Sequence, residues 1–239
     1  MTLATRPGVT QSFVILGVEG RKPEAVALLY VGAGGRINLR TEEGQVKFSA
    51  RNFLPRSGGD FVRNGVLPVV MDAPSDQPGG MDDGFRLGDA HAEDIGKVIA
   101  DLKKRFPGLP VFLVGTSRGT ISAASAGRRL GKEVDGVVLT ATLFLASRTQ
   151  PGLSGFDFST IPSPLLFVHH VDDGCTYTPY SSARRLADRY PLVSVSGGRP
   201  PEAKPCEAMT PHGFLGKEAE TVDAMAKWMQ KQPHPREIN

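Results

Sequence analysis

Short apolar runs rich in β-branched residues recur along the chain, and longer stretches with helical spacing separate most of them. Strands of a parallel sheet that is buried on both faces produce such continuous apolar runs. The runs that predict strands are Ser12–Leu16, Ala25–Val31, Val66–Met71, Val111–Val114, Val137–Thr140, Leu165–His169 and Leu192–Val195. The stretches that predict helices are Phe48–Asn64, Asp89–Phe106, Ile121–Leu130, Pro179–Tyr190 and Phe214–Lys231.

This alternation predicts an α/β fold with a mostly parallel central sheet and helices on both faces. The first two runs are joined by the short turn Gly20-Arg21-Lys22-Pro23, which predicts an antiparallel hairpin at one edge of the sheet. No linker-like stretch divides the 239 residues. We therefore expect a single domain over residues 1–239, with its core between about residues 12 and 230.

Charge and composition exclude several classes of partner. The formal net charge is only +3, and neither a block of basic residues nor interleaved aromatic and basic residues is present, so nucleic-acid binding is not expected. No apolar run approaches the length of a membrane span. The N-terminal residues 1–8 lack the apolar segment of a signal peptide.

One serine stands where a predicted strand turns into a predicted helix. Gly115-Thr116-Ser117-Arg118-Gly119 follows Val111–Val114 directly and precedes a helix rich in small residues. Glycines two positions before and after a serine leave room for a sharp turn that exposes its hydroxyl. A chain with 28 glycines matches so short a pattern by chance roughly 0.2 times. The flanking elements therefore carry the prediction that Ser117 is a nucleophile, the alternative being a glycine-rich turn with an incidental serine.

A serine nucleophile needs a general base, and the base needs an orienting carboxylate. In one known chain order, both follow the serine. The histidines after Ser117 are His169, His170, His212 and His234. We predict His212 as the base, because it lies in a loop between the last strand and the last helix and can reach across the top of the sheet. The alternative is that His212 is an ordinary surface histidine. His234 lies in a proline-rich tail.

The orienting acid is expected just past the end of a strand, because ligands of open α/β sheets bind beyond the carboxyl ends of the strands. Asp172 and Asp173 follow the run Leu165–His169. We predict Asp173, at the apex of the loop, as the acid. Asp172 is the alternative, or else a turn residue that binds main-chain amides, and Asp157 is an outside candidate.

An oxyanion hole requires two convergent N–H donors. One is predicted to be the main-chain N–H of Arg118, the residue after the nucleophile. The second is predicted in the loop Val31-Gly32-Ala33-Gly34-Gly35-Arg36, because glycines let main-chain amides approach a ligand. Ala33 is the first choice and Gly34 the second. The loop has neither G-x-G-x-x-G spacing nor a following Lys-Ser/Thr, which argues against a nucleotide site.

With these segments in this order, the sequence resembles the α/β-hydrolase superfamily from about residue 12 to residue 229. The most specific parts are Gly115–Gly119 with its strand, Leu165–Asp173, and the segment Pro-His-Gly-Phe at residues 211–214. The pattern is similar to exported bacterial hydrolases with Gly-Thr-Ser-Arg-Gly and His-His-x-x-Asp-x-Cys segments. The resemblance implies that Ser117 is the nucleophile, Asp173 the orienting acid and His212 the base.

One segment departs from the family pattern. The predicted oxyanion loop begins Tyr30-Val31-Gly32, without the His-Gly pair that is common in the superfamily. The identity of the second oxyanion donor therefore stays open between Ala33 and Gly34.

The two cysteines flank the predicted acid and base. Cys175 lies two residues after Asp173, and Cys206 lies six residues before His212. If the acid and histidine loops meet, the cysteines come near each other, so we predict a disulfide bond worth about 3–4 kcal/mol. That bond predicts a periplasmic or secreted protein; two reduced cysteines in a cytoplasmic enzyme are the alternative. Two cysteines are too few for a zinc site, and Cys175 is a poor nucleophile because it lacks a strand-to-helix turn.

These residues predict hydrolysis of a small-molecule carboxylic ester through an acyl-enzyme, with no metal ion and no organic cofactor. The alternatives are peptide or amide hydrolysis, acyl transfer with the same triad, and a non-catalytic binding member of the fold. Residues 141–164 leave room for a loop or a helix but not for a lid domain. The turn-rich segment at residues 72–81 is expected to line the mouth of the site.

Overall fold

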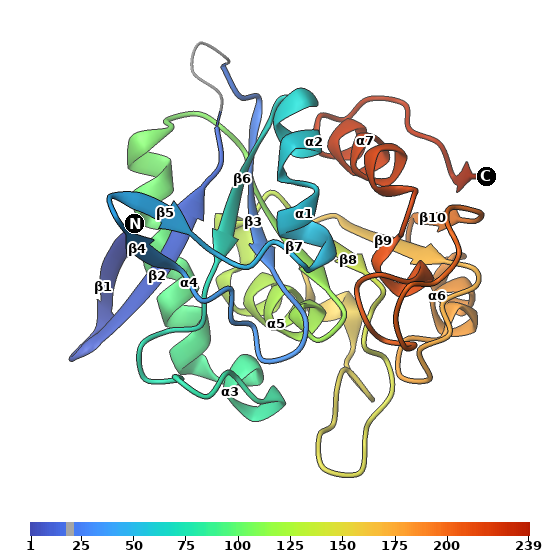
Figure 1. The fold of residues 1–239 in the computed structure, drawn as a ribbon, viewed down its shortest axis with the longest axis horizontal. Coiled ribbons are helices and arrows are strands. Elements are labelled where there is room, and N and C mark those ends of the chain that lie inside the picture. Colours follow the sequence, from blue (N-terminus) through green and yellow to red (C-terminus); the bar gives the residue numbers. More distant parts are fainter. Residues whose placement is uncertain (18–21) are drawn as a thin grey trace.

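The computed structural model describes residues 1–17 and 22–239 and contains one nine-stranded sheet in the order β1-β2-β6-β3-β7-β8-β9-β10-β11 (Figure 1). Within the described residues, a separate two-stranded ribbon is formed by β4 (Arg40–Glu42) and β5 (Gln45–Lys47). The strands of the main sheet are β1 (Thr2–Arg6), β2 (Val9–Ile15), β3 (Ala25–Tyr30), β6 (Val66–Met71), β7 (Val111–Thr116), β8 (Gly136–Thr140), β9 (Leu165–His170), β10 (Leu192–Val195) and β11 (Glu237–Ile238).

The sheet is mostly parallel, as predicted. Neighbours from β6 through β11 run parallel, and only the pairs β1–β2 and β2–β6 are antiparallel. Every residue of β3, β6, β7, β8 and β9 is buried. Burial on both faces is the physical reason why these strands are continuous apolar runs in the sequence.

The predicted hairpin between the first two runs is wrong. β2 pairs with β6, with Phe13 opposite Met71 and Ile15 opposite Val69. β3 instead lies between β6 and β7, both parallel to it. Both edges of β3 are therefore occupied by other buried apolar strands. The turn predicted at residues 20–23 lies partly outside the described residues.

Helices cover both faces of the sheet. One core packs α4, α5 and α6 against the sheet, and the other packs α1, α2 and α7 against the opposite face. The helices are α1 (Phe53–Arg56), α2 (Gly58–Arg63), α3 (Asp83–Leu87), α4 (Asp89–Arg105), α5 (Gly119–Leu130), α6 (Tyr180–Leu186) and α7 (Glu218–Met229). The helix predicted over residues 48–64 is two short helices, and the last helix begins at Glu218 rather than Phe214, because Phe214 has a left-handed backbone conformation.

Among the described residues, five helices and strands carry no sequence prediction, namely the edge strands β1 and β11, the ribbon strands β4 and β5, and the five-residue helix α3. Residues 141–164 contain only one short 3₁₀ turn, Phe158–Thr160, and form a loop that extends from the body of the protein, yellow in Figure 1. The part of the chain that the structure describes therefore contains no lid domain, as predicted. Across the described residues, no helix has the length and apolar character needed to cross a membrane.

Candidate active site

Ser117 lies at the sharp turn between β7 and α5. Its φ of 53° is in the left-handed region, which is uncommon for a residue with a side chain and marks strain at functional turns. A Cβ at Gly115 would lie 2.5 Å from the carbonyl oxygen of Gly119, and one at Gly119 would collide with the carbonyl oxygen of Tyr30. The two glycines are thus required by the close crossing of strand and helix, as the sequence pattern predicts.

Asp173 and His212 meet although 39 residues separate them in sequence. His212 Nδ1 lies 3.0 Å from Asp173 Oδ2 and 3.2 Å from Oδ1, so the ring donates its Nδ1 proton to the carboxylate. Both side chains are buried. The side chain of Asp172 instead remains 71% exposed and lies 4.0 Å from His170. Of the two aspartates, only Asp173 contacts the predicted base.

Three further hydrogen bonds hold this pair in place. The Cys175 N–H donates to Asp173 Oδ1 at 2.9 Å, and Thr178 Oγ1 donates to Oδ2 at 2.7 Å. On the other side, Thr210 Oγ1 accepts from the His212 N–H at 3.1 Å and so caps the 3₁₀ turn that carries the ring. Burial alone raises the pKa of Asp173, but the hydrogen bonds from His212, Cys175 and Thr178 outweigh it. The pKa of Asp173 consequently lies below its ordinary value, and the carboxylate stays ionised.

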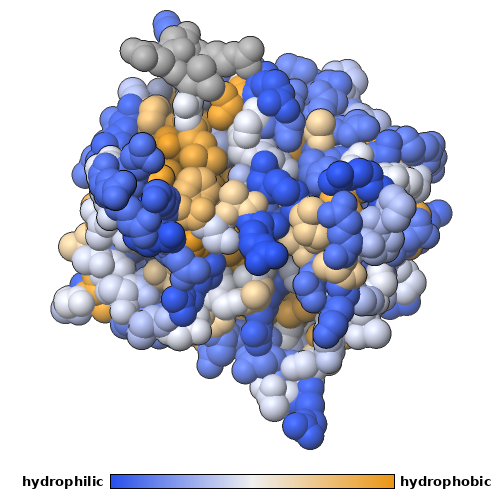
Figure 2. Space-filling view, viewed as in Figure 1, coloured by the Kyte–Doolittle hydropathy of each residue, from blue (hydrophilic) through white to orange (hydrophobic). Residues whose placement is uncertain are grey.

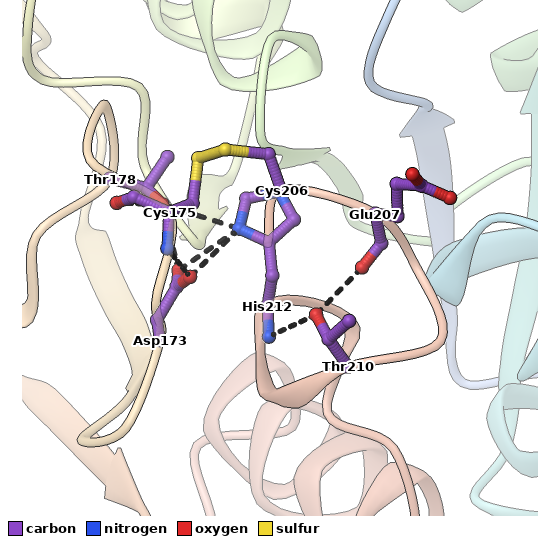
Figure 3. The surroundings of a disulfide bond; sticks show 7 residues. All are labelled: Asp173, Cys175, Thr178, Cys206, Glu207, Thr210 and His212. Atoms are coloured by element: carbon purple, nitrogen blue, oxygen red, sulfur yellow. Dashed lines mark hydrogen bonds and ion pairs between the residues drawn. A yellow bond between two sulfur atoms is a disulfide. The ribbon is translucent and has the colours of Figure 1, made fainter. Parts of the chain in front are cut away.

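The predicted disulfide bond is present between Cys175 and Cys206. It joins the loop of Asp173 to the loop of His212, and Figure 3 shows it beside the His212 ring. Neither loop belongs to a helix or strand at these positions. The covalent bond therefore supplies a connection between acid and base loops that regular secondary structure does not.

Ser117 and His212 line one groove of about 920 Å³. His212 Nε2 is buried and has no hydrogen-bond partner among the described residues, so its lone pair is available to a proton donor. Other groove residues are Val31, Gly32, Ala33, Arg36, Ser49, Arg51, Asn52, Phe53, Thr116, Glu202, Ala203, Lys204, Cys206, Glu207, Ala208, Met209 and Gly213. The groove thus carries charged side chains of both signs.

The remaining candidates lie away from this groove. His170 is occupied, because its Nε2 lies 3.0 Å from the Gly197 carbonyl and its Nδ1 accepts from the Asp172 N–H. His169 Nε2 accepts from the main-chain N–H at residue 142. Burial lowers the pKa of His169 to about 3. His234 is only partly exposed and does not line the groove, and Asp157 caps the 3₁₀ turn at residues 158–160.

The predicted oxyanion loop passes directly beside the serine. A Cβ at Gly32 would lie 3.1 Å from Ser117 Cβ. The loop makes a tight turn, in which the Gly35 N–H donates to the Gly32 carbonyl at 3.0 Å and Ala33 has a φ of 49°. Within residues 1–17 and 22–239, the main-chain N–H groups of Ala33 and Arg118 have no hydrogen-bond acceptor. Neither N–H is therefore used for a hydrogen bond within the described part of the fold.

The segment at residues 72–81 does not line this groove. Asp72 accepts hydrogen bonds from the main-chain N–H groups of Ile37 and Leu39, and Asp76 pairs with Arg6. These aspartates hold the loop and β1 in place rather than facing a ligand. The expectation that the segment lines the mouth of the site is wrong, because its polar groups are used within the fold.

Two buried charges near the serine are absent from the sequence prediction. Asp83 and Arg86 lie on α3, and their exposed fractions are 0% and 1%. Burial, followed by the nearby charge of Arg118, lowers the pKa of Arg86 to about 9. A short segment with alternating charges resembles a solvated helix face, so the sequence contains no pattern that distinguishes these two residues. Thr178 was missed for the same reason, as one threonine in a loop.

Among the described residues, no cluster of three or more acidic, histidine or cysteine side chains could hold a metal ion.

Comparison with known proteins agrees with this architecture. A family model described as serine aminopeptidase, S33, matches residues 80–177. Est1E from Butyrivibrio proteoclasticus, solved with bound ferulic acid, shares 13% identity, a TM-score of 0.66, and coverage of 97% of this chain and 98% of its own. XC6422 from Xanthomonas campestris, described as a serine hydrolase without lid, shares 18% identity, a TM-score of 0.60, and coverage of 98% and 95%.

A soluble variant of monoglyceride lipase from Saccharomyces cerevisiae shares 14% identity with a TM-score of 0.59, and the alignment covers 97% of this chain and 94% of the lipase. No curated protein matches the sequence. At identities this low, the likeness concerns the fold. That fold, together with the family match, places the chain in the α/β-hydrolase superfamily. Within that superfamily it is an enzyme of the serine hydrolase class.

Proposed function

We propose that the protein hydrolyses carboxylic esters of small molecules, with Ser117 as nucleophile, His212 as general base and Asp173 as orienting acid. The observation that carries this proposal is the buried Asp173–His212 pair, whose free Nε2 belongs to the groove that Ser117 also lines. A base held by a carboxylate on one ring nitrogen and free on the other is the arrangement that serine catalysis needs. Charged residues of both signs in the groove favour polar esters.

In the first half of the reaction, His212 Nε2 accepts the Ser117 hydroxyl proton while Oγ bonds to the ester carbonyl carbon. The carbonyl electron pair moves onto oxygen, and the N–H groups of Ala33 and Arg118 bind that oxyanion, each contributing roughly 3–4 kcal/mol. The electron pair then returns, the bond to the alcohol oxygen breaks, and the alcohol leaves with the proton from His212. The product of this half is an acyl-serine.

In the second half, a water molecule gives a proton to His212 as its oxygen attacks the acyl carbon. The same two N–H groups bind the second oxyanion. When the intermediate collapses, the bond to Ser117 breaks, the serine oxygen recovers its proton from His212, and the carboxylic acid leaves. These steps require no metal ion or organic cofactor.

Ser117→Ala tests this mechanism on a panel of p-nitrophenyl esters and aminoacyl anilides. We expect kcat on esters to fall by at least about 1,000-fold, because removal of a nucleophile disables the whole triad. His234→Gln, a substitution in the exposed tail, is the control and should keep wild-type kcat. Wild-type ester turnover in Ser117→Ala would refute the mechanism.

Amide hydrolysis is the second candidate, because the family model that matches residues 80–177 is described as a serine aminopeptidase. The same panel separates the two activities. Turnover confined to the anilides would overturn the esterase proposal while leaving the triad intact.

We further infer that the enzyme works in an oxidising compartment, either the periplasm or outside the cell. The Cys175–Cys206 bond supports this, since such bonds persist chiefly outside the reducing cytoplasm. Thiol counting on denatured protein, taken without reductant from each cell fraction of the source organism, tests it. Two free thiols in the native pool would contradict the inference.

A further inference from the structure

The short helix α3 carries two fully buried charged residues that the proposed reaction does not use. Asp83 and Arg86 are 0% and 1% exposed. A buried charge is costly unless hydrogen bonds satisfy it, so the partners of these two residues indicate what the helix holds. One partner of each residue lies in a segment that carries a proposed oxyanion donor.

Arg86 holds the first segment. Its Nη2 donates to the Ala33 carbonyl at 3.0 Å, and its Nη1 donates to Ser122 Oγ on α5 at 2.7 Å. A Cβ at Gly35 would lie 2.6 Å from Nη2, so the loop passes directly over the guanidinium group. The Met81 N–H, two residues before α3, adds a hydrogen bond to the Gly34 carbonyl at 2.8 Å.

The Ala33 conformation needs such support. Its φ of 49° is in the left-handed region, which is unfavourable for a residue with a Cβ. If the loop relaxed to a negative φ, the adjoining peptide groups would rotate and the free Ala33 N–H would point elsewhere. The bond from Arg86 to the Ala33 carbonyl opposes that rotation.

Asp83 holds the second segment. Its Oδ1 accepts from Arg118 Nε at 2.6 Å, and its Oδ2 accepts from the Gly152 N–H at 2.9 Å. Arg118 immediately follows the serine, and its own N–H is the other donor without an acceptor among the described residues. Asp83 therefore ties Arg118, the residue just before α5, to α3 and to the long loop that contains Gly152.

We propose that α3 positions both halves of the oxyanion hole, with Arg86 holding the Ala33 peptide and Asp83 holding Arg118. Both are positioning residues, since neither touches the reacting atoms. The inference rests on the proposed function, because it takes Ala33 and Arg118 as the donors. It adds that their geometry depends on two buried side chains of one five-residue helix rather than on the loop alone.

The test compares Arg86→Met, Arg86→Lys and Asp83→Asn with Asp94→Asn. Asp94 is the matched control, because it is another fully buried carboxylate paired with an arginine, here Arg6 at 2.9 Å, and it does not line the groove. The substrates are an ester of p-nitrophenol and the corresponding thionoester. Sulfur is a weak hydrogen-bond acceptor, so a formed oxyanion hole favours the oxygen ester.

We expect Arg86→Met to lower kcat on the oxygen ester by about 10- to 100-fold, which approaches the effect of removing one oxyanion-hole donor. KM should stay within about threefold of the wild-type value. The ratio of oxygen-ester to thionoester kcat/KM should fall with kcat, and Arg86→Lys should recover part of both. Asp94→Asn should lower the melting temperature yet keep the wild-type ratio. A folded Arg86→Met with the wild-type ratio, or with equal losses on both substrates, overturns the proposal.

If Arg86→Met does not fold, the isosteric variant Asp83→Asn is measured instead. A wild-type ratio of oxygen-ester to thionoester kcat/KM in that variant overturns the proposal. If the proposed function itself is wrong, the wild-type protein will show no turnover that depends on Ser117. In that case the NMR amide resonances of Ala33 and Arg118 test the positioning role. They should shift in Asp83→Asn and Arg86→Lys but not in Asp94→Asn, and unchanged resonances would overturn the positioning role.

Discussion

The protein is expected to be about 4 kcal/mol less stable at pH 5 than at pH 7, because His91 and His169 are buried as neutral rings. Their exposed fractions are 2% and 0%. Burial lowers the pKa of each to about 3, assisted at His91 by the charges of Arg86 and Arg6. His91 has no hydrogen-bond partner for either ring nitrogen among the described residues, and His169 uses only Nε2.

The sign follows from proton binding in the two states. An unfolded histidine takes up its proton near pH 6.5, whereas these two take it up in the folded state only near pH 3. Between those values the unfolded chain holds more protons, so stability is lost as the pH falls. Each histidine contributes about 2 kcal/mol between pH 7 and pH 5.

The assay is urea unfolding at pH 7, 6 and 5, followed by circular dichroism and by the fluorescence of Trp228, the single tryptophan. His91→Leu and His169→Gln should each halve the pH-dependent loss to about 2 kcal/mol. His234→Gln is the control, because that side chain is partly exposed in the folded protein, whereas His91 and His169 are buried. Equal wild-type stability at pH 5 and pH 7, or a full loss retained in both variants, would refute the reasoning.

Three further variants test the elbow and the loops around Asp173. The double variant Cys175→Ser/Cys206→Ser should lose about 4 kcal/mol of stability, since the bond closes a separation of 31 residues; non-reducing urea unfolding measures it, and wild-type stability would contradict it. Thr178→Val should cost about 1 kcal/mol and lower kcat more than it raises KM, because Asp173 loses its 2.7 Å hydrogen bond; unchanged kinetics would exclude an orienting role. Gly119→Ala should give little folded protein, because its Cβ would collide with a carbonyl oxygen of β3; a fully folded variant would contradict that packing.

The sequence predicted the centre of the sheet better than its edges. β3 and β7 are continuous apolar runs because both of their faces are buried, so their positions follow from hydrophobicity alone. The edge strands β1 and β11 are short and partly exposed and have no such pattern. The strand order was harder still, because β6 enters between β2 and β3, and nearness in sequence favoured the wrong pair.

At the candidate site, residues that follow strands could be found, and residues that act through packing could not. Ser117 and His212 belong to local patterns with a place in chain order. The disulfide bond was correctly predicted from the positions of its cysteines beside the acid and base loops. Asp83 and Arg86 had no such indication, because their burial depends on α3 packing near α4 and α5 in three dimensions.

The two-residue strand β11 has a consequence for how the protein behaves in concentrated solution. Without it, β10 would be the edge of the sheet, and unpaired N–H and carbonyl groups at such an edge recruit extended segments of other molecules. The Ser194 N–H instead donates to the Arg236 carbonyl at 2.9 Å, and the Ser196 N–H donates to the Ile238 carbonyl at 2.7 Å. The segment around Glu237–Ile238 thus protects the sheet against self-association, and its removal would favour aggregation of otherwise folded molecules.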